Sequence, residues 1–547
     1  MQKLKVRQTA DQSFELKPAE ERMLSAVVEF LVYIIESFTG SVIENYSPTG
    51  FQEADGDRGL LEEDNLADFT RFDSRGVDTV FQEFDPLPGH YGKMAWKLSR
   101  PPSLKFLVTC FKTVFKMQFV FGSSIGLLAI AIAVLDFNTA DLCYEKTAQW
   151  YSMPRVIQSI RVTSQSIEGF FIQLWHFSIM LCIFGFSFMK DLNLFTVNLL
   201  AAFTDCCYRL YLQIFGIYKH SWMSYPLNVL FTSMVMTNSV IIAKYIIPEH
   251  LYSKKTLFKT TGLLALQFIF GLPICFLLVY KIFPWYNEKS EIEKVFIAGL
   301  SPLFLSIPKV IVRTAVPKFN LVHPGVLHLL IGTLYTAAAF VFRVMQAELV
   351  NFWLFVALGA GHAVVDLIER LTVSMRDYIW EYAYKLLSRC CRSRPRNFPA
   401  GITRTPRSMR FVADVSIQLV LTEANALVSA VGFSQLYNFM YPDDFQTPDG
   451  YFESLIWQFL ARCVTGLAID VFFNTVSLWL QAMYLNVAVL KVWRSKQWRY
   501  HVISNVVCTI MVVLYFTEYL FAIERGKHNG KKLKRFAFNC SLPFSKF

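Results

Sequence analysis

The sequence predicts an all-α fold, a polytopic integral membrane helical bundle of about eleven transmembrane helices, within a range of 10–12. Hydrophobic residues make up 54% of the 547 residues and the mean hydropathy is +0.36, against roughly 45–50% apolar residues in a soluble domain. Much of this excess lies in runs of about 20 residues, the length that crosses a hydrocarbon core of ~30 Å. The sequence contains no CxxC pair, paired-histidine zinc motif or Gly-rich phosphate loop, so neither a cofactor nor a metal is predicted.

The apolar runs place the predicted spans along most of the chain after residue 116. They are Met117–Asp136, Phe170–Met189, Leu192–Ile217, Trp222–Ile247, Thr260–Phe283, Val295–Val312, Val322–Val344, Phe352–Thr372, Phe411–Tyr437, Leu455–Val489 and His501–Ala522. They define a transmembrane domain over residues 101–523. The tenth run is long enough for one tilted helix or for a tight hairpin, and we favour one helix.

Residues 1–100 are predicted to form a cytoplasmic N-terminal region without a cleavable signal peptide. Residues 24–38 are apolar but short and carry two glutamates, which favours an amphipathic helix lying on the membrane. Residues 44–85 hold twelve acids against three arginines and show little periodicity, which is typical of a disordered segment. A solvated tail is the plainer interpretation of this segment, and docking of a protein partner is the alternative.

Basic residues in alternate short loops predict a cytoplasmic N-terminus. The strongest signal is the loop over residues 373–410, which carries eight basic residues and no acid between Lys385 and Arg410. An odd number of spans conflicts with the basic C-terminal tail, residues 524–547, which it would place outside. The Asn539 sequon in that tail could be glycosylated only if the tail is external.

Several predicted spans contain charged residues, which cost several kcal/mol in a membrane unless they are paired or hydrated. The third span carries Asp205 and Arg209 at helical spacing for an ion pair, which either locks two helices or gates a path. The eighth span aligns His362, Asp366 and Glu369 on one face. A histidine beside a carboxylate can form a buried hydrogen bond, relay a proton or, with further ligands, bind a metal.

The ninth and tenth spans also have polar faces. The ninth contributes Glu423 and Asn425, and the tenth contributes Arg462, Asp470 and Asn474. Polar faces at membrane depth must point at one another or at water, so we expect spans eight, nine and ten to share a polar interior.

Prolines interrupt two successive spans. Gly271 and Pro273 lie in the fifth span, and Pro302 and Pro308 lie in the sixth. Because proline removes a backbone donor and clashes with the preceding turn, the sequence predicts broken helices here or, alternatively, ordinary kinks. Broken spans often line a central site.

The basic loop also suggests contacts at the membrane surface. Its arginines are expected to bind anionic lipid headgroups rather than nucleic acid, because the lipid bilayer is adjacent and no nucleic-acid-binding module is evident. Cys390 and Cys391 beside this loop are candidates for palmitoylation or remain free thiols.

These features favour a transporter or channel-like conduit between the fifth and tenth spans. One alternative is an intramembrane enzyme acting on a lipid, with His362 as general base. About eleven spans with one intramembrane histidine loosely resembles the architecture of membrane-bound O-acyltransferases, an analogy that no sequence signature accompanies. The other alternative is a non-catalytic membrane assembly or trafficking factor. The sequence leaves the substrate, the organelle and the oligomeric state open.

Overall fold

The computed structural model describes residues 104–135, 155–215, 225–319, 321–322, 324–371, 406–440, 451–484, 487, 489–494 and 498–530. The chain separates into residues 1–71 and residues 72–547, and every described residue belongs to the second unit. The predicted amphipathic helix over 24–38, the acidic segment over 44–85, most of the basic loop, Cys390, Cys391 and the tail beyond residue 530 lie outside the described residues.

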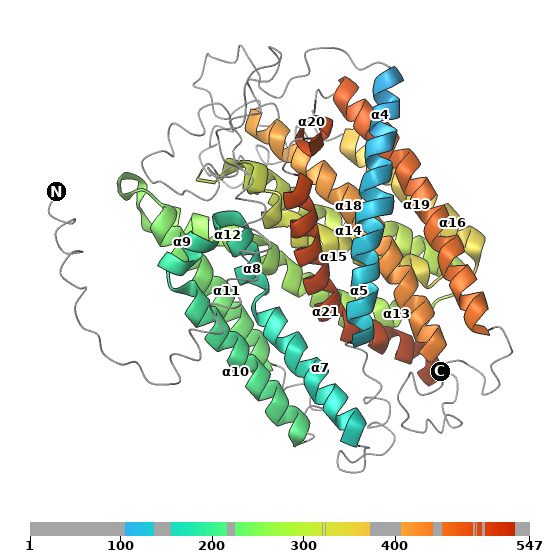
Figure 1. Cartoon of the computed structure of the whole chain (residues 1–547), viewed down its shortest axis with the longest axis horizontal. Helices are drawn as coiled ribbons and strands as arrows, with labels where there is room; N and C mark the ends of the chain where they lie inside the picture. Colours follow the sequence, from blue (N-terminus) through green and yellow to red (C-terminus); the bar gives the residue numbers. More distant parts are fainter. Residues whose placement is uncertain are drawn as a thin grey trace, which may run out of the picture. The chain divides into compact units, whose positions relative to one another are not determined.

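The described residues form helices joined by turns, with no β-strand among them, which confirms the all-α class (Figure 1). In chain order the helices used below are α4 (Leu104–Phe115), η2 (Lys116–Gly122), α5 (Ser123–Leu135), α7 (Arg155–Gln173), α8 (Trp175–Phe184), α10 (Leu194–Ile214), α11 (Tyr225–Ile246), α12 (Lys254–Leu277), η6 (Leu278–Ile282), α14 (Glu291–Ala315), η8 (Pro324–Val326), α15 (Leu329–Ala347), α16 (Phe352–Leu371), α18 (Pro406–Met440), α19 (Tyr451–Tyr484), α20 (Val489–Arg494) and α21 (Trp498–Gly530).

Seven of these helical runs are long and apolar enough to cross a membrane, counted over the described residues. They are α4 to α5 taken together, α11, α15, α16, α18, α19 and α21. An eighth is possible if α7 and α8, which meet with a 42° bend, form one span. These helices indicate a membrane-embedded protein, but the predicted count of eleven is not confirmed. Helices also form where the third, fifth and sixth spans were predicted, as α10, α12 and α14.

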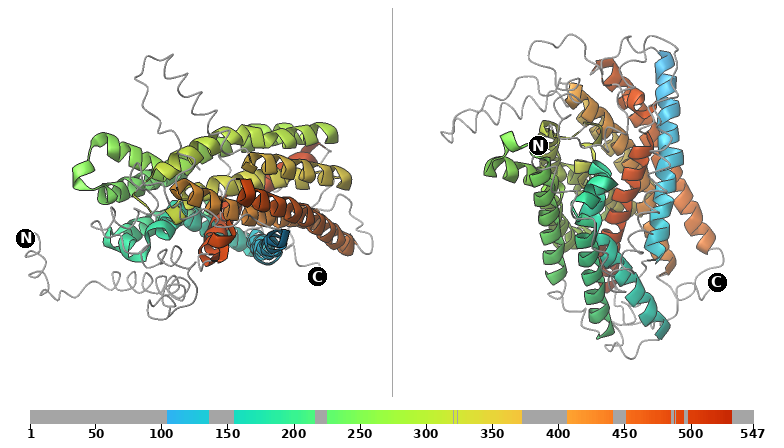
Figure 2. Two further views of the ribbon diagram at one scale, coloured as in Figure 1. Left: turned by 90° about the horizontal axis from the view of Figure 1, so that it is seen from above. Right: turned by 60° about the vertical axis from the view of Figure 1, so that its left-hand side comes forward.

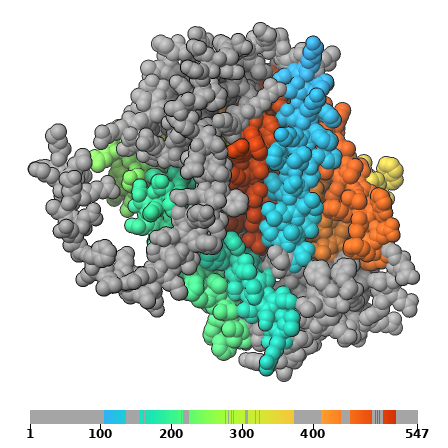
Figure 3. Space-filling view, in the orientation of Figure 1, coloured from blue at the N-terminus to red at the C-terminus, as the bar shows by residue number. Residues whose placement is uncertain are grey.

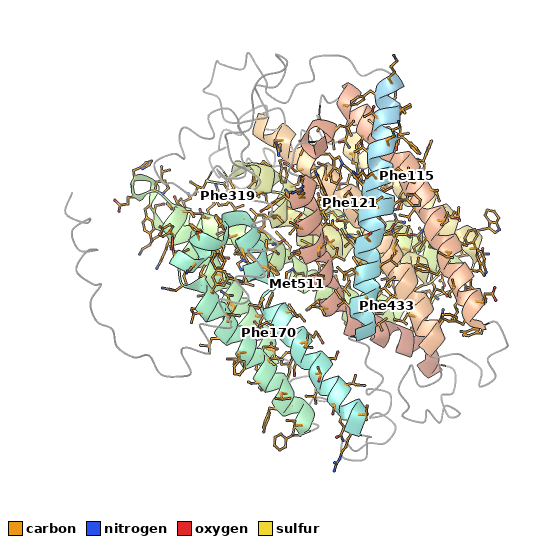
Figure 4. All side chains as sticks on the ribbon, viewed as in Figure 1. Phe115, Phe121, Phe170, Phe319, Phe433 and Met511 are labelled. Atoms are coloured by element: carbon orange, nitrogen blue, oxygen red, sulfur yellow. The ribbon has the colours of Figure 1, made fainter. Side chains whose placement is uncertain are left out.

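Two helices form the centre of the bundle. In α15 and α18, 89% of the most apolar window is buried, against 22% in α16. The run from α4 to α5 and helix α14 lie on opposite sides, with α15, α18 and α21 between them (Figure 2). Figure 3 shows α4 to α5 on the surface beside α19 and α21. Figure 4 shows Phe121 on this run, where its ring meets Trp493 of α20 and Trp498 of α21 at centroid distances of 5.8 and 5.1 Å.

The prolines do not break the helices in which they lie, so of the two predicted alternatives the structure does not show the broken helices. Helix α12 continues through Gly271 and Pro273 into the π-helical turn η6, and α14 is one helix of 25 residues through Pro302 and Pro308. At Pro302 the structure supplies a substitute for the missing backbone donor. The Ser301 hydroxyl donates to the Ala298 carbonyl at 2.8 Å, and this carbonyl is the acceptor that an N–H at position 302 would have used.

Helix α14 begins at a capping box. The backbone N–H of Ser290 donates to the Glu293 carboxylate at 3.0 Å, and this bond holds the pKa of Glu293 below its usual range. The predicted tenth span is a single helix of 34 residues, α19, rather than a hairpin.

Glycine allows α5 and α18 to pack closely. A Cβ atom built on Gly126 would lie 2.7 Å from the Val428 Cβ and 3.0 Å from the Asn425 carbonyl oxygen. We expect Gly126→Ala to lower the free energy of unfolding in detergent by about 1–3 kcal/mol, because a rigid neighbour and backbone would have to move. The matched control is Gly361→Ala in α16, where the new Cβ meets nothing within 4 Å. This control should be neutral or stabilising by up to about 1 kcal/mol, so equal losses in both variants would contradict the packing argument.

Candidate functional site

A cavity lies among five helices, α14, α15, α16, α18 and α19. Its volume is about 60 Å³, enough for a few water molecules. Most of its wall is apolar, but the wall also contains both basic and acidic side chains. The polar and charged lining residues are Lys309, Arg313, Tyr335, His362, Asp366, Glu369, Arg370, Ser416, Glu423 and Gln481.

An ion pair between α16 and α18 forms one wall of the cavity. The Arg370 guanidinium donates to the Glu423 carboxylate at 2.5 Å and to the side-chain oxygen of Asn474 on α19. Asn474 in turn donates to the other carboxylate oxygen of Glu423 at 2.8 Å. All three side chains are buried. Such a pair needs this complete set of partners, because removing charges from water costs several kcal/mol per ion.

A second carboxyl group faces this ion pair. Asp366 and Glu423 both line the cavity, and the Asp366 carboxylate lies 3.5 Å from His362 Nε2. Carboxyl and imidazole groups are the side chains that intramembrane proton relays use. The His362 ring stacks on Phe342 at a centroid distance of 3.7 Å, and its Nδ1 has no hydrogen-bond partner among the described residues. The group can therefore bind and pass on a proton.

A second buried ion pair joins α15 and α19. The Arg343 guanidinium donates to the Asp470 carboxylate at 2.5 Å and to the Gln346 side chain at 2.8 Å. Gln346 continues the chain of polar contacts by donating to the Phe355 carbonyl at 2.9 Å. Polar groups thus extend from the cavity along α15 and α16 towards the turn that joins these two helices.

Arg462 closes the far end of this polar chain and does not line the cavity. Its guanidinium donates to the carbonyls of Ala347, Leu349 and Val350, at 2.9, 2.9 and 3.2 Å, where α15 ends. The guanidinium also lies 5.4 Å from the Phe355 ring centroid. Orphan carbonyls at a helix C-terminus need donors, and this arginine supplies them from α19.

Asp205 and Arg209 belong to a separate cluster between α7 and α10. Arg209 donates to Asp205 at 2.6 Å, as the spacing predicts, and Gln173 donates to the other carboxylate oxygen at 2.8 Å. Glu168 lies 3.7 Å from Arg209. A Cβ on Gly169 would come within 2.1 Å of Asp205, so this glycine makes room for the pair. These contacts hold α7 and α10 together.

Asn425 also lies away from the cavity, in a hydrogen-bonded network between α18 and α21. Its side chain donates to Asn505 and, at 2.9 Å, to Thr509. Asn505 donates to the Thr422 hydroxyl at 2.8 Å. The predicted candidates are therefore divided: His362, Asp366, Glu369, Glu423, Asp470 and Asn474 lie on or beside the cavity, whereas the remaining charged and amide candidates lie elsewhere.

Sequence reasoning missed the arginines that neutralise the acids, Arg343 and Arg370, and the histidines His328 and His501. The spacing of Asp366 and Arg370 is the same i,i+4 pattern that pointed to Asp205 and Arg209, so Arg370 could have been found. For the two histidines no sequence signal exists. They meet Asp414 from separate parts of the chain, and the ligand atoms of the three residues lie within 4.8 Å of one another.

Comparison of the chain with protein families, curated proteins and solved structures finds no match.

Proposed function

We propose that the protein is a membrane conduit that carries protons, alone or coupled to a small solute, through the cavity among α14, α15, α16, α18 and α19. The observation that carries the proposal is that Asp366, Glu423 and His362 line one cavity, on a wall that also holds Arg370. Carboxyl groups beside an imidazole are the kind of group that intramembrane proton relays use.

The extent of the polar groups supports the same proposal. They follow one another from Lys309 and Arg313 on α14, past Asp366 and Arg343, to Gln346. Arg462 and Phe355 then close the chain of contacts. If the basic loops are cytoplasmic, the cavity lies in the cytoplasmic half of the bundle. The contacts of Arg462 and Phe355 then lie towards the other side of the membrane. This corresponds to a conduit held closed at one end.

The proposal predicts that neutralising either carboxyl group stops proton movement. In proteoliposomes loaded with a pH-sensitive dye, Asp366→Asn and Glu423→Gln should each reduce the proton flux at least about 100-fold, the effect expected of a positioned proton-transfer group. Glu453→Gln is the matched control, because Glu453 is an exposed carboxylate in the first turn of α19. Wild-type flux in both cavity variants would refute the conduit.

The second candidate is an enzyme that acts on a lipid, with His362 as general base. It is favoured by the unpartnered Nδ1 of His362 and by the exposed apolar side chains of α16, such as Val365 and Ile368, which give this helix a lipid-facing side. The same vesicles distinguish the two functions. Turnover of vesicle lipid that His362→Ala abolishes, without proton flux in the wild type, would establish the enzyme.

A further inference from the structure

We infer that His328, Asp414 and His501 form a binding site for a divalent transition-metal ion of the zinc class. The site joins the start of α15, the start of α18 and the start of α21. Zinc takes imidazole nitrogen and carboxylate oxygen as ligands, and three protein ligands plus one exchangeable position is a common coordination set. The site is distinct from the cavity of the proposed conduit, and the inference does not depend on that function.

The histidine nitrogens supply the first argument. His328 and His501 are 0% and 1% exposed, and each ring has one nitrogen without a hydrogen-bond partner among the described residues, Nε2 in His328 and Nδ1 in His501. A buried polar atom without a partner costs free energy comparable to a lost hydrogen bond. The unpartnered Nε2 of His328, in a ring whose centroid lies 4.5 Å from that of the His501 ring, is therefore available to an ion that His501 would hold through its Nε2.

The outer hydrogen bonds supply the second argument. His328 Nδ1 lies 2.9 Å from the Gly325 carbonyl, which fixes the proton on Nδ1 and leaves the Nε2 lone pair free. Metal-binding histidines usually donate their other N–H to a carbonyl or a carboxylate in this way. Asp414 is oriented similarly, because one of its oxygens accepts from Arg410 Nε at 2.8 Å and the other faces His501.

The distances supply the third argument. His501 Nε2 and an Asp414 oxygen lie 3.0 Å apart, which matches roughly the separation of two ligand atoms that each bond one ion at about 2.0–2.2 Å. The third ligand atom lies within 4.8 Å of both, so all three atoms lie close enough together to surround one ion after small side-chain movements. Arg410 brings a positive charge to the edge of the site. It contacts the Asp414 oxygen that does not face His501, and it partly offsets the charge of that carboxylate.

The test uses the full-length protein, purified in detergent, stripped with a chelator and titrated with ZnCl₂. We expect about one equivalent of zinc to remain after gel filtration and a rise in the thermal unfolding midpoint, since a ligand that binds only the folded state stabilises it. His328→Gln and His501→Gln should each weaken zinc binding by at least about 10–100-fold, the loss that changes around a metal ligand produce.

His176→Gln is the matched control, because His176 is also buried but its ring nitrogens face Asn238 and Ser239 on α11. This variant should bind zinc like the wild type. The inference is overturned if the stripped wild type binds no zinc with saturation, or if His328→Gln and His501→Gln bind as the wild type does. The wild-type titration decides the question alone if either ligand variant fails to fold.

Discussion

Replacing Arg343 with leucine is expected to lower the free energy of unfolding by about 3–5 kcal/mol. Both partners of the Arg343–Asp470 pair are 2% exposed, so the variant leaves an uncompensated carboxylate inside the bundle. Arg343→Leu also removes the donor to Gln346, which in turn positions a contact to α16. Denaturant unfolding in detergent, followed by tryptophan fluorescence, measures the loss.

The double variant Arg343→Leu with Asp470→Leu separates charge from packing. Replacing a buried ion pair by apolar side chains of similar volume is often neutral, so the double variant should recover most of the stability that the single variant loses. If the double variant is as unstable as the single one, the loss comes from packing around Arg343 rather than from the unpaired carboxylate of Asp470.

Replacing Arg462 with methionine is expected to cost about 2–4 kcal/mol of the free energy of unfolding. Methionine keeps the length of the side chain but leaves three carbonyls at the end of α15 without their charged donor, and hydrogen bonds to charged groups contribute roughly 1.5–3 kcal/mol each. The expected loss is smaller than the sum over the three hydrogen bonds, because the turn after α15 is exposed at Val350 and water can bind the carbonyl there. The same unfolding measurement in detergent detects it.

Arg499→Met provides the comparison for the Arg462 variant. Arg499 is exposed at the start of α21 and stacks over the Trp498 ring at 5.7 Å. Its replacement should change the free energy of unfolding by no more than about 0.5 kcal/mol, as is usual for surface positions. An equal loss of the free energy of unfolding in both variants would show that the three hydrogen bonds of Arg462 do not stabilise the fold.

The sequence predicts the helical elements well because apolar runs and helical spacing are local properties. The eighth to tenth spans appear as α16, α18 and α19, and the Asp205–Arg209 pair forms at its i,i+4 spacing. Hydrophobic pattern also indicates that polar faces turn inward. It does not say which polar groups meet.

Partner choice could not be predicted, because it depends on how distant helices pack. Asp470 pairs with an arginine that lies 127 residues earlier in the chain, and His501 meets Asp414 across 87 residues. The helices continue through Pro273, Pro302 and Pro308, and at Pro302 the Ser301 hydroxyl takes the carbonyl that the lost donor would have used. A proline in the sequence therefore does not by itself show where a helix is interrupted.

The burial of α15 and α18 has a consequence for how the protein is made. Helix α18 carries Arg410, Asp414, Glu423 and Asn425, so a newly synthesised α18 that met only lipid would expose two ion-pair partners and several amides. Its stable insertion therefore depends on α16, α19 and α21, which receive those groups. We therefore expect the early helices of this bundle to remain at the translocon until the later helices emerge. A chain that is truncated before α19 should be degraded by quality control.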